Sequence, residues 1–289
     1  MNNRIIALFA VIVIAVAGVS IVAFMSNGDD NDNDAYAVSL NGVEATESNV
    51  RDNSYLIKRN LIVCTNGEAT GNVAEFLNYV TSADGQKIVG KEFISIDKMT
   101  DYKDPDKDGK TMIAISGSTT IMDTMTRIAE GYMAKYPYMK VSITGGGSGQ
   151  GASNTINGVS DIGMCSRDLK ASEAEKGLIP TIIGKDGVAV IVNGAGVKDL
   201  TIEQVAKIYD GTYTNWSQVG GVDKSIGVVC REDGSGTREC FEESIKASTP
   251  GWKMKSDVNS LSSTGAVIKM IGNTDGSIGY ISIGQLVNL

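Results

Sequence analysis

Hydroxyl and glycine residues are concentrated in four short loops of this sequence, and one of these loops also carries an arginine. The loops read TNGEATG at 65–71, SGSTT at 116–120, GGGSGQG at 145–151 and REDGSGT at 231–237. A helix-like segment follows each loop, and a helix start offers unpaired backbone N–H groups and about half a positive charge from the macrodipole. Glycines let the backbone approach a ligand, and hydroxyls add donors. The pattern predicts an anion site, although such residues are also ordinary helix caps and turns.

Catalysis by a serine or cysteine nucleophile that uses a histidine base is excluded, because the chain contains no histidine. Ser-His-Asp and Cys-His systems need histidine as the base, and many zinc sites need it as a ligand. A nucleophile elbow needs GxSxG, but position 233 is Asp and position 150 is Gln. GGGSGQG lacks the lysine of a Walker A loop, and GSGQGA at 147–152 matches the relaxed dinucleotide fingerprint only weakly. We therefore expect neither an enzyme nor a cofactor.

Two other groups of residues are candidates for metal or thiol chemistry. DPDKDG at 104–109 matches the start of a calcium loop, but the twelfth position, which should be Glu, is Ile115. A solvated turn is the preferred interpretation and a calcium site the alternative. The four cysteines are Cys64, Cys165, Cys230 and Cys240, and none of them forms the CxxC spacing of a metal site. Buried free thiols are the preferred interpretation, and disulfides are the alternative.

The bulk composition indicates a globular protein large enough for two lobes. The chain has 289 residues, of which 42% are hydrophobic and 21% charged. Its net charge is -8 and it has no basic run, whereas a nucleic-acid backbone requires clustered Lys and Arg. Nucleic acid is therefore not an expected partner, and local geometry must hold an anionic ligand against the overall charge.

Strands and helices that alternate along the chain must position these loops. Strand-like runs (NLIVC, TMIAI, KVSIT and SIGVVC) lead into them. Within 121–136, one apolar stripe at helical spacing is formed by Ile121, Met125, Ile128 and Tyr132. The alternation predicts an α/β fold with mainly parallel sheets, in which the four loops converge on one crevice at the carboxyl ends of the strands.

The N-terminal segment has the length and composition of a membrane span. Residues 5–25 contain no charge, and a spanning helix needs about 20 apolar residues. AVA before Gly18 is a candidate cleavage site, so a secretory signal is the alternative. Arg4 on the short side predicts that the N-terminus is inside and the rest of the chain outside. The polar, acidic residues 26–34 are expected to be a flexible tether.

Four segments together resemble those of high-affinity phosphate-binding proteins of ABC importers, which have the type II periplasmic-binding-protein fold. In the family's own order they are ISGSTTIMDTMTRIAEGY, ITGGGSGQGASNTINGVSDIGMCSRDL, VVCREDGSGTRECF and GSIGYISIGQL. The resemblance covers nearly everything after the tether. It implies a two-lobed α/β molecule with a hinge, which holds its anion between the lobes.

One segment stands out of the family's order. Residues 37–96 resemble the family's C-terminal end, yet they precede the segment that resembles its N-terminus. This implies a circular permutation, in which the charged linker 97–110 joins the old ends and new ends open at Leu289 and near Tyr36. Domain termini often lie close together on the surface, which makes the change tolerable. The alternative is a piece of a tandem array or a wrongly predicted gene.

The permutation defines the expected domains. Residues 1–34 are the membrane anchor and acidic tether, residues 61–187 with the linker 97–110 form lobe I, and residues 35–60 with 188–289 form lobe II. The tether enters lobe II, so lobe I is free to close over the ligand by hinge motion.

The resemblance also implies a set of ligand residues from three of the loops. SGSTT and GGGSGQG would give hydroxyls and a backbone N–H, while REDGSGT would give an arginine for the ion pair, oriented by Asp233, and a helix start. The implied phosphate ligands are Ser118, Thr119, Thr120, Ser148, Arg231, Ser235, Gly236 and Thr237.

Two further candidates lie where the sequence departs from the family. Family members often carry an Asp that accepts the proton of hydrogen phosphate, but this chain has Ser166 there, followed by Arg167. A carboxylate repels sulfate, whereas a serine can accept that proton and can also donate to sulfate, so phosphate-over-sulfate selectivity stays open. Arg167 is either a second ion-pair donor or a solvated side chain.

These observations predict a monomeric solute-binding protein that a single N-terminal helix tethers to the cell membrane, with its soluble part on the extracellular or periplasmic face. A cleaved N-terminal segment would instead give a secreted protein. We expect it to capture inorganic phosphate for the permease subunits of an ABC importer. The alternatives are a receptor for another tetrahedral oxyanion, such as sulfate or molybdate, and a cell-surface phosphate sensor without transport.

Overall fold

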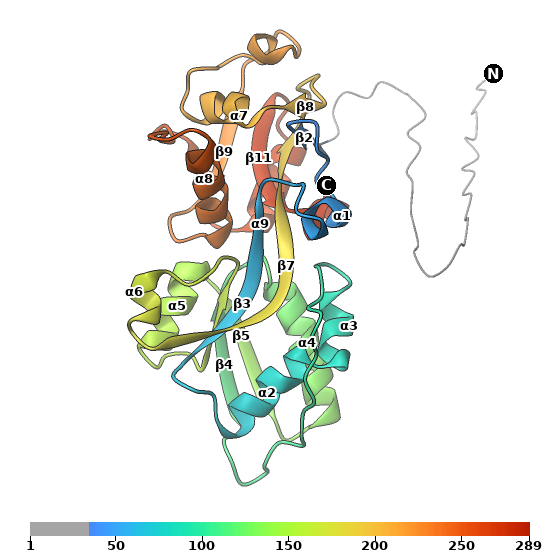
Figure 1. Cartoon of the computed structure of the whole chain (residues 1–289), viewed down its shortest axis with the longest axis vertical. Coiled ribbons are helices and arrows are strands. Elements are labelled where there is room, and N and C mark those ends of the chain that lie inside the picture. The colour runs from blue at the N-terminus through green and yellow to red at the C-terminus, as the bar shows by residue number, and fades with distance from the viewer. Residues whose placement is uncertain (1–34) are drawn as a thin grey trace, which may run out of the picture. The chain divides into compact units, whose positions relative to one another are not determined.

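The computed structural model describes residues 35–289, which Figure 1 shows in colour. The predicted membrane span at 5–25 and the tether at 26–34 lie outside the described residues. Within residues 35–289, no helix is both long enough and apolar enough to cross a membrane.

Nine strands of the described residues form one mixed sheet. Across the sheet their order is β10 (Asn259–Leu261), β9 (Gly227–Arg231), β11 (Ser277–Ser282), β7 (Leu178–Val192), β3 (Lys58–Asn66), β6 (Ile162–Cys165), β4 (Met112–Gly117) and β5 (Lys140–Gly145), and β1 (Tyr36–Ala37) also pairs with β7. β2 (Ser39–Leu40) pairs with β8 (Asp199–Leu200) separately. β4, β5 and β6 are parallel, as are β9, β10 and β11, whereas β3 and β7 run antiparallel to their neighbours.

The two antiparallel strands pass from one half of the molecule to the other (Figure 1). β3 pairs with the first part of β7, from Lys58 opposite Gly187 to Asn66 opposite Leu178. The rest of β7 pairs with β11. β7 has 15 residues and is rich in β-branched side chains, which suit a strand at the centre of a sheet. A pair of continuous strands therefore connects the two halves.

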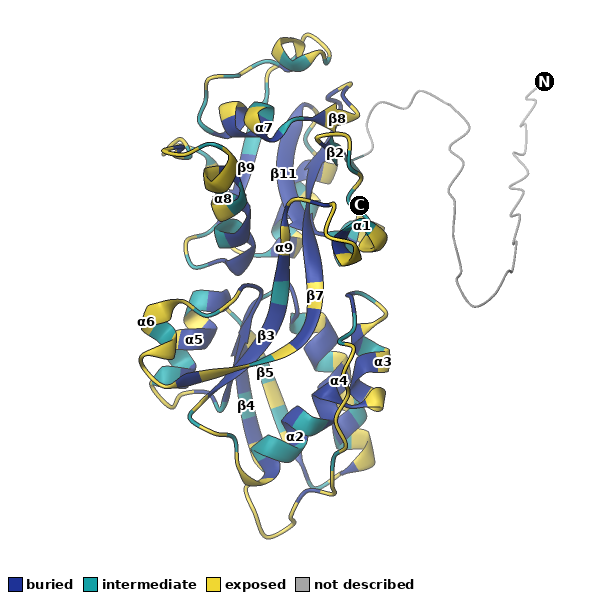
Figure 2. Ribbon diagram, viewed as in Figure 1, coloured by how far each residue is buried: buried dark blue, intermediate teal, exposed yellow. Residues whose placement is uncertain are grey.

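Each half has its own hydrophobic core, and the strands at both cores are buried (Figure 2). We call lobe I the half whose core residues lie within 61–183. We call lobe II the half whose core residues lie within 38–57 and 188–280, and Ile94 also belongs to this core. The architecture is the predicted two-lobed α/β fold. Its sheet is mixed because the two crossing strands oppose the parallel strands on either side.

Helices cover both faces of the sheet in lobe I. Along β3, Leu61 and Val63 belong to the core formed with α2 and α4, whereas Ile62 and Cys64 pack in a second cluster with Ala152 of α5. This alternation is the period of a strand covered on both faces. The helices of this lobe are α2 (Gly71–Thr81), α3 (Ala83–Val89), α4 (Met122–Lys135), α5 (Ser148–Ile156) and α6 (Ala171–Ala174).

Lobe II is built around a stack of aromatic rings. The rings of Phe241 and Tyr280 are stacked with their centroids 4.0 Å apart, and Tyr209 packs against both. The helices of this lobe are α1 (Glu47–Arg51), α7 (Ile202–Tyr209), η1 (Trp216–Val219), α8 (Gly236–Ser248), α9 (Thr264–Gly272) and η2 (Ile283–Asn288).

The linker at 97–110 contains neither helix nor strand, and side chains of lobe I hold it in place. Asn72 of α2 accepts a hydrogen bond from the Asp106 backbone N–H at 2.7 Å and donates to the carbonyl oxygens of Asp106 and Lys110. Asp104 accepts from the Tyr136 hydroxyl at 2.7 Å. In the part of the chain that the structure describes, no group of three or more His, Cys, Asp or Glu side chains is arranged to hold a metal ion. Within the DPDKDG segment, Asp106 also accepts from the Asp108 backbone N–H at 3.0 Å.

All four cysteines are buried free thiols, as the sequence indicated. Cys64 and Cys165 lie on the neighbouring strands β3 and β6, where Cys64 is opposite Gly163 and Cys165 is opposite Ile62. The other two cysteines belong to the core of lobe II.

Candidate anion-binding site

Three of the four predicted loops meet between the lobes. β4 and β5 end at Gly117 and Gly145, and β9 ends at Arg231, so the hydroxyl-rich residues that follow these strands lie at the carboxyl ends of the two parallel sets. The fourth loop, TNGEATG at 65–71, does not join them, and that prediction was wrong. It follows β3, which runs antiparallel to β6, so its carboxyl end lies at the opposite edge of lobe I.

Arg231 is the centre of the lobe II side of the site, and its side chain is only 2% exposed. Its Nε and Nη2 donate to the two carboxylate oxygens of Glu232, each at 2.8 Å. Nη1 donates to Thr264 Oγ1 at 2.9 Å, and Nη2 reaches Thr119 Oγ1 of lobe I at 3.1 Å. Arg231 therefore bridges the lobes with a charge that one carboxylate balances.

The residue that orients Arg231 is Glu232, and the prediction of Asp233 was wrong. The side chain of Asp233 is 97% exposed and pairs with Arg238 at 2.7 Å. The change of direction at Gly234, whose φ is +82°, turns the chain between Arg231 and the start of α8. Sequence proximity could not decide between two adjacent acidic residues, because the backbone direction sets which one faces the arginine.

The start of α8 packs against lobe I. Ser235 is the N-cap, and its hydroxyl accepts from the Arg238 backbone N–H at 3.4 Å. Gly236 follows at the point of closest approach, where a side-chain Cβ would collide with Ser148 Oγ and lie 2.9 Å from Ser166 Oγ. Thr237 Oγ1 lies 2.9 Å from Thr120 Oγ1. Glycine at 236 thus lets a helix start of lobe II meet the hydroxyls of lobe I.

Ser148 and Ser166 form the lobe I surface opposite Gly236. Ser148 is the first residue of α5, and its hydroxyl accepts from the Ser166 backbone N–H at 3.0 Å, with the two hydroxyl oxygens 3.4 Å apart. The Gly149 backbone N–H donates to the Gly234 carbonyl across the lobes at 2.9 Å. Both serines are fully buried because the lobes are closed over them.

The SGSTT loop completes the lobe I side. Ser118 Oγ accepts from the Thr120 backbone N–H at 3.3 Å just before α4 begins. The Thr120 carbonyl accepts from the Gln285 side chain of η2 at 3.3 Å. Ser118 and Thr120 are buried, and Thr119 is half-buried beside Arg231.

Arg167 points away from these hydroxyls. Its guanidinium pairs with Glu173 of α6 through two 2.8 Å hydrogen bonds, and its Nε lies 2.7 Å from Glu239 of α8. Burial by itself would lower the pKa of Arg167, but the two carboxylates outweigh burial and raise the pKa. The solvated alternative was wrong, since the side chain is 5% exposed. Arg167 instead joins lobe I to lobe II by an ion pair.

The sequence interpretation missed two residues that contact the site. Thr264 is the first residue of α9 and accepts a hydrogen bond from Arg231. The available signal was the sequence SST at 262–264, a Ser/Thr helix start like those of the predicted loops. Arg59 donates from Nη1 to Thr237 Oγ1 at 2.8 Å and to the Ser166 carbonyl at 3.0 Å. A charged residue inside the apolar strand-like run YLIKRNLIVC was the available signal for Arg59.

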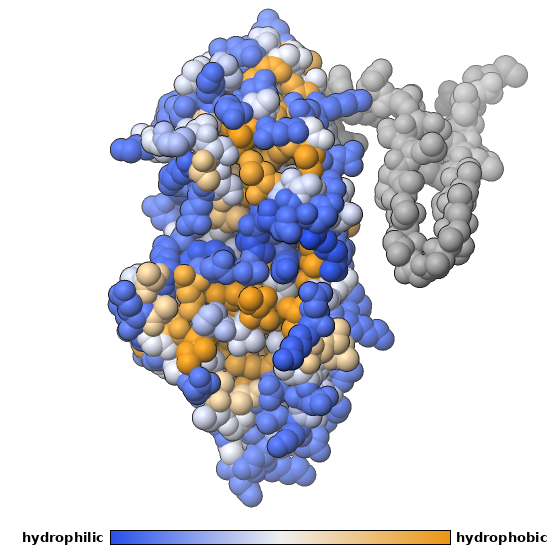
Figure 3. Space-filling model, viewed as in Figure 1, coloured by the Kyte–Doolittle hydropathy of each residue, from blue (hydrophilic) through white to orange (hydrophobic). Residues whose placement is uncertain are grey.

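The assembled groups are rich in hydrogen-bond donors, and Glu232 is the carboxylate that contacts them. Two buried guanidinium groups, the starts of α5 and α8, and hydroxyls from both lobes surround one region between the lobes. Such a set suits a tetrahedral oxyanion, because helix starts and hydroxyls can donate hydrogen bonds to an anion. The waist between the lobes is mostly hydrophilic on the face seen in Figure 3.

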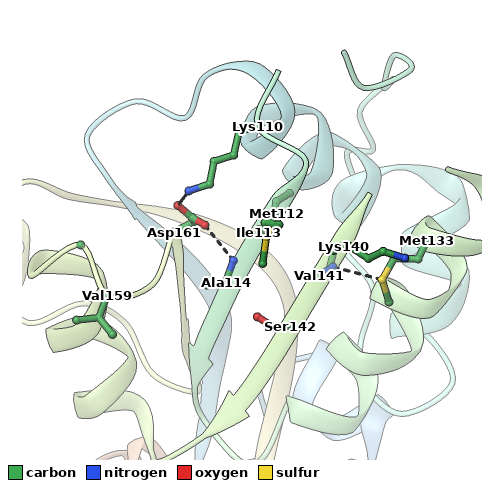
Figure 4. Close-up of a pocket in the computed structure, with 11 residues that line it drawn as sticks. Lys110, Met112, Ile113, Ala114, Met133, Lys140, Val141, Ser142, Val159 and Asp161 are labelled. Carbon is green, nitrogen blue, oxygen red and sulfur yellow. Dashed lines mark hydrogen bonds and ion pairs between the residues drawn. The ribbon is translucent and has the colours of Figure 1, made fainter. Parts of the chain in front are cut away.

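A separate hollow of about 270 Å³ lies at the other end of lobe I (Figure 4). Met112 and Lys140, which line it, begin β4 and β5, so it is at the amino ends of strands whose carboxyl ends carry the site. Its Asp161 carboxylate accepts from Lys110 and from the Ala114 backbone N–H at 2.9 Å. That carboxylate is already bonded to lobe I, and the hollow has no part in the donor cluster.

Comparisons with known proteins give the family of this chain. The PBP superfamily domain matches residues 104–289. Phosphate-binding protein PstS 2 of Streptococcus agalactiae serotype V is 34% identical over 203 residues, which are 69% of this chain and 68% of that protein.

Solved structures give the same family. A substrate-binding protein from Clostridium perfringens, assigned to a phosphate ABC transporter and solved with bound phosphate, is 40% identical with a TM-score of 0.55, over 59% of this chain and 70% of that one. The phosphate-binding protein of a Streptococcus pneumoniae phosphate ABC transporter is 26% identical with a TM-score of 0.56, over 64% and 72%. The chain belongs to the PBP superfamily, within the family of PstS-type phosphate-binding proteins.

Proposed function

We propose that this protein is a monomeric solute-binding protein that captures inorganic phosphate between its lobes and delivers it to the permease subunits of an ABC importer. The observation that carries the proposal is the buried donor cluster around Arg231, which joins helix starts and hydroxyls from both lobes. A micromolar Kd corresponds to about 8 kcal/mol, which several charge-assisted hydrogen bonds of about 1.5–3 kcal/mol each supply after desolvation. The names of the similar proteins support phosphate as the anion.

The proposed ligand groups come from both lobes. Arg231 forms the ion pair, and the start of α8 supplies backbone N–H groups. For Arg167 we propose an ion pair that holds the lobes together rather than contact with the anion, because Glu173 and Glu239 occupy its guanidinium. The remaining proposed ligands are Ser118, Thr119, Thr120, Ser148, Ser166, Ser235, Gly236 and Thr237.

Calorimetric titration of the full chain in detergent tests this function. We expect phosphate and arsenate to bind and molybdate to bind more weakly. Failure of every oxyanion to bind would contradict the proposal and favour a sensor or structural role that does not involve these anions. The control is the same titration with chloride.

A broader oxyanion receptor is the second candidate, and Ser166 favours it. Its hydroxyl lies 3.4 Å from Ser148 Oγ, and a hydroxyl both donates and accepts, so it does not repel sulfate as a carboxylate would. Competition between phosphate and sulfate in the same titration separates the two candidates. Equal affinities would establish the broader receptor, and an excess of sulfate without effect on phosphate binding would exclude it.

We also propose the circular permutation and the lobe boundaries that follow from it. β1 and β11 both pair with β7 near Val192, and Ala35, Ala37 and Leu286 pack against one apolar cluster, so the proposed new ends lie in one region. The family match begins at residue 104 and leaves 35–103 outside it. A chain built as residues 111–289 followed by 35–96 restores the proposed family order. We expect it to fold and bind phosphate, and an unfolded product would contradict the permutation.

The membrane tether is a further proposal, supported by the uncharged residues 5–25. We expect the protein to stay in the membrane fraction after a high-salt wash. Release of a soluble chain beginning near Gly18 would establish a cleaved signal instead.

A further inference from the structure

Arg59 is a second buried arginine at the centre of the molecule, on the crossing strand β3. Its partner is Asp186, the residue directly opposite on the other crossing strand, β7. Arg59 Nε and Nη2 both donate to Asp186 Oδ2, at 3.1 and 2.7 Å, and both side chains are 2% exposed. Ser282 donates to the other oxygen of Asp186 at 2.8 Å. The guanidinium is therefore fixed where the strands pass between the lobes.

The remaining nitrogen of this guanidinium contacts one group from each lobe. Nη1 donates to the Ser166 carbonyl of lobe I at 3.0 Å and to Thr237 Oγ1 of lobe II at 2.8 Å. Ser166 and Thr237 are proposed anion ligands. A single rigid group on the crossing strand thus touches the anion site from both sides when the lobes are closed.

The contact with Thr237 determines what that hydroxyl can do. A threonine hydroxyl has one proton to donate and two acceptor positions. The Arg59 N–H occupies one acceptor position, so the Thr237 proton stays free to be donated, either to Thr120 Oγ1 or to an anion. A bond from a charged donor also polarises the hydroxyl and strengthens the bond that it donates.

Arg231 does the same to two other hydroxyls. Its Nη1 and Nη2 donate to Thr264 and Thr119, so these oxygens also accept from a guanidinium. Each arginine has its own carboxylate, Glu232 or Asp186, so neither needs the anion for charge balance. The two arginines differ in position, since Arg59 belongs to the strands that link the lobes.

We propose that Arg59 is a positioning residue of the anion site, which commits the Thr237 hydroxyl to donate once the lobes close. Arg59 acts through Thr237 and does not itself need to contact the anion. The proposal rests on the phosphate-binding function proposed above.

A double-mutant cycle on the full chain in detergent, with inorganic phosphate as the probe, tests this role. We expect Arg59→Lys and Thr237→Val each to weaken phosphate binding about tenfold or more, the size of one charge-assisted hydrogen bond. If Arg59 acts through Thr237, then Arg59→Lys has little further effect in the Thr237→Val background. Its effect should persist in the Thr237→Ser background, which keeps the hydroxyl.

Ser282→Ala is the matched control. It removes a hydrogen bond to the same Asp186 carboxylate but leaves the contact between Arg59 and Thr237 in place. We expect it to lower thermal stability and leave phosphate affinity unchanged. An equal loss of affinity in Ser282→Ala would show that Arg59 only stabilises the hinge, and would overturn the proposal.

The remaining outcomes also decide whether Arg59 positions the site. Multiplicative losses in the double mutant, or no loss in Arg59→Lys, would overturn the role of Arg59 while the wild type still binds phosphate. Absence of phosphate binding by the wild type would instead refute the proposed function and the inference with it. If Arg59→Lys does not fold, the Arg59→Gln/Asp186→Asn variant replaces it, because it removes both buried charges together. The same losses of phosphate affinity are expected for this variant, and the same results would overturn the proposal.

Discussion

At the residue scale, the site depends on a few side chains whose neighbours fix their orientation. Arg231 is held by Glu232 in a two-point contact and shares its remaining N–H groups with hydroxyls of both lobes. Such an arrangement keeps a charged fork in a buried position, where an unpaired arginine would be costly.

Removing the Arg231 guanidinium should weaken binding without unfolding the protein. We expect Arg231→Ala to lower phosphate affinity at least about tenfold, since charge-assisted bonds are worth about 1.5–3 kcal/mol. Titration calorimetry measures the loss, and circular dichroism checks the fold. Arg51→Ala is the control, because Arg51 is exposed and pairs only with Glu47 in its own helix. Unchanged affinity in Arg231→Ala would place the site elsewhere.

The close approach at Gly236 predicts that a larger side chain there would interfere with binding. A methyl group there would collide with Ser148 Oγ, so Gly236→Ala should keep the lobes from closing and weaken phosphate binding strongly. Thermal stability without ligand should change little, because each lobe keeps its own core. Gly265→Ala is the matched control near the start of α9, since a Cβ at Gly265 meets nothing within 4 Å. Equal affinities of the two variants would contradict the close approach.

At the element scale, α6 and α8 are joined by an ion-pair network that lies outside the hydroxyl cluster. Arg167 pairs with Glu173 and Glu239, and Lys170 also pairs with Glu239. The elements themselves are ordinary: α8 has a serine N-cap, and Glu173 also caps α6 by accepting from the Lys170 backbone N–H. The closed arrangement therefore depends partly on charges at the ends of two helices.

This network predicts a pH dependence. Burial favours the neutral form of Glu173, but Arg167 and the Lys170 N–H outweigh burial and lower its pKa below the ordinary 4.5. A lowered pKa gives stability that is present above the ordinary value and lost as pH falls through the lowered one. We expect the melting temperature of the wild type to fall more steeply between about pH 5 and pH 3 than that of Glu173→Gln.

Glu47→Gln is the control for that comparison, because its partner Arg51 lies on the same exposed helix and such surface pairs contribute little. Parallel melting curves for the wild type and Glu173→Gln across this pH range would show that the ion pair between Arg167 and Glu173 does not contribute to stability.

At the scale of the whole molecule, ligand binding and lobe closure should be one event. Contacts between the lobes include the Gly149 to Gly234 backbone bond, the Thr120 to Thr237 hydroxyl pair and the Arg231 to Thr119 bond. All of them lie beside proposed ligand groups. An anion that bonds to both lobes at once therefore stabilises the closed arrangement.

Phosphate should accordingly raise the thermal stability of the intact protein in a concentration-dependent way. A ligand at 100 times its Kd stabilises the folded state by about 2.7 kcal/mol. Differential scanning calorimetry over a phosphate series measures the shift, and Arg231→Ala should show a smaller one at each concentration. A melting temperature that does not respond to phosphate would contradict binding to the folded state.

Much of the fold was predictable because its signals are local. Strand runs followed by Gly/Ser/Thr helix starts predicted the α/β class, and the stripe of Met125, Ile128 and Tyr132 predicted the buried face of α4. The loop at 65–71 carried the same local signal and still did not join the site. Strand direction determines where a loop lies, and the composition of β3 does not report that direction.

The sequence by itself excluded histidine-based catalysis and predicted the hydroxyl-rich helix starts as candidate anion ligands. Only the tertiary structure decided which charges meet: Glu232 rather than Asp233 at Arg231, Glu173 and Glu239 at Arg167, and Asp186 at Arg59. Helix starts and hydroxyls act through neighbours in the chain, so sequence reveals them. The ion pair between Arg59 and Asp186 joins residues that are far apart in the chain. Only the packing of the two crossing strands brings Arg59 Nη2 to 2.7 Å from Asp186 Oδ2.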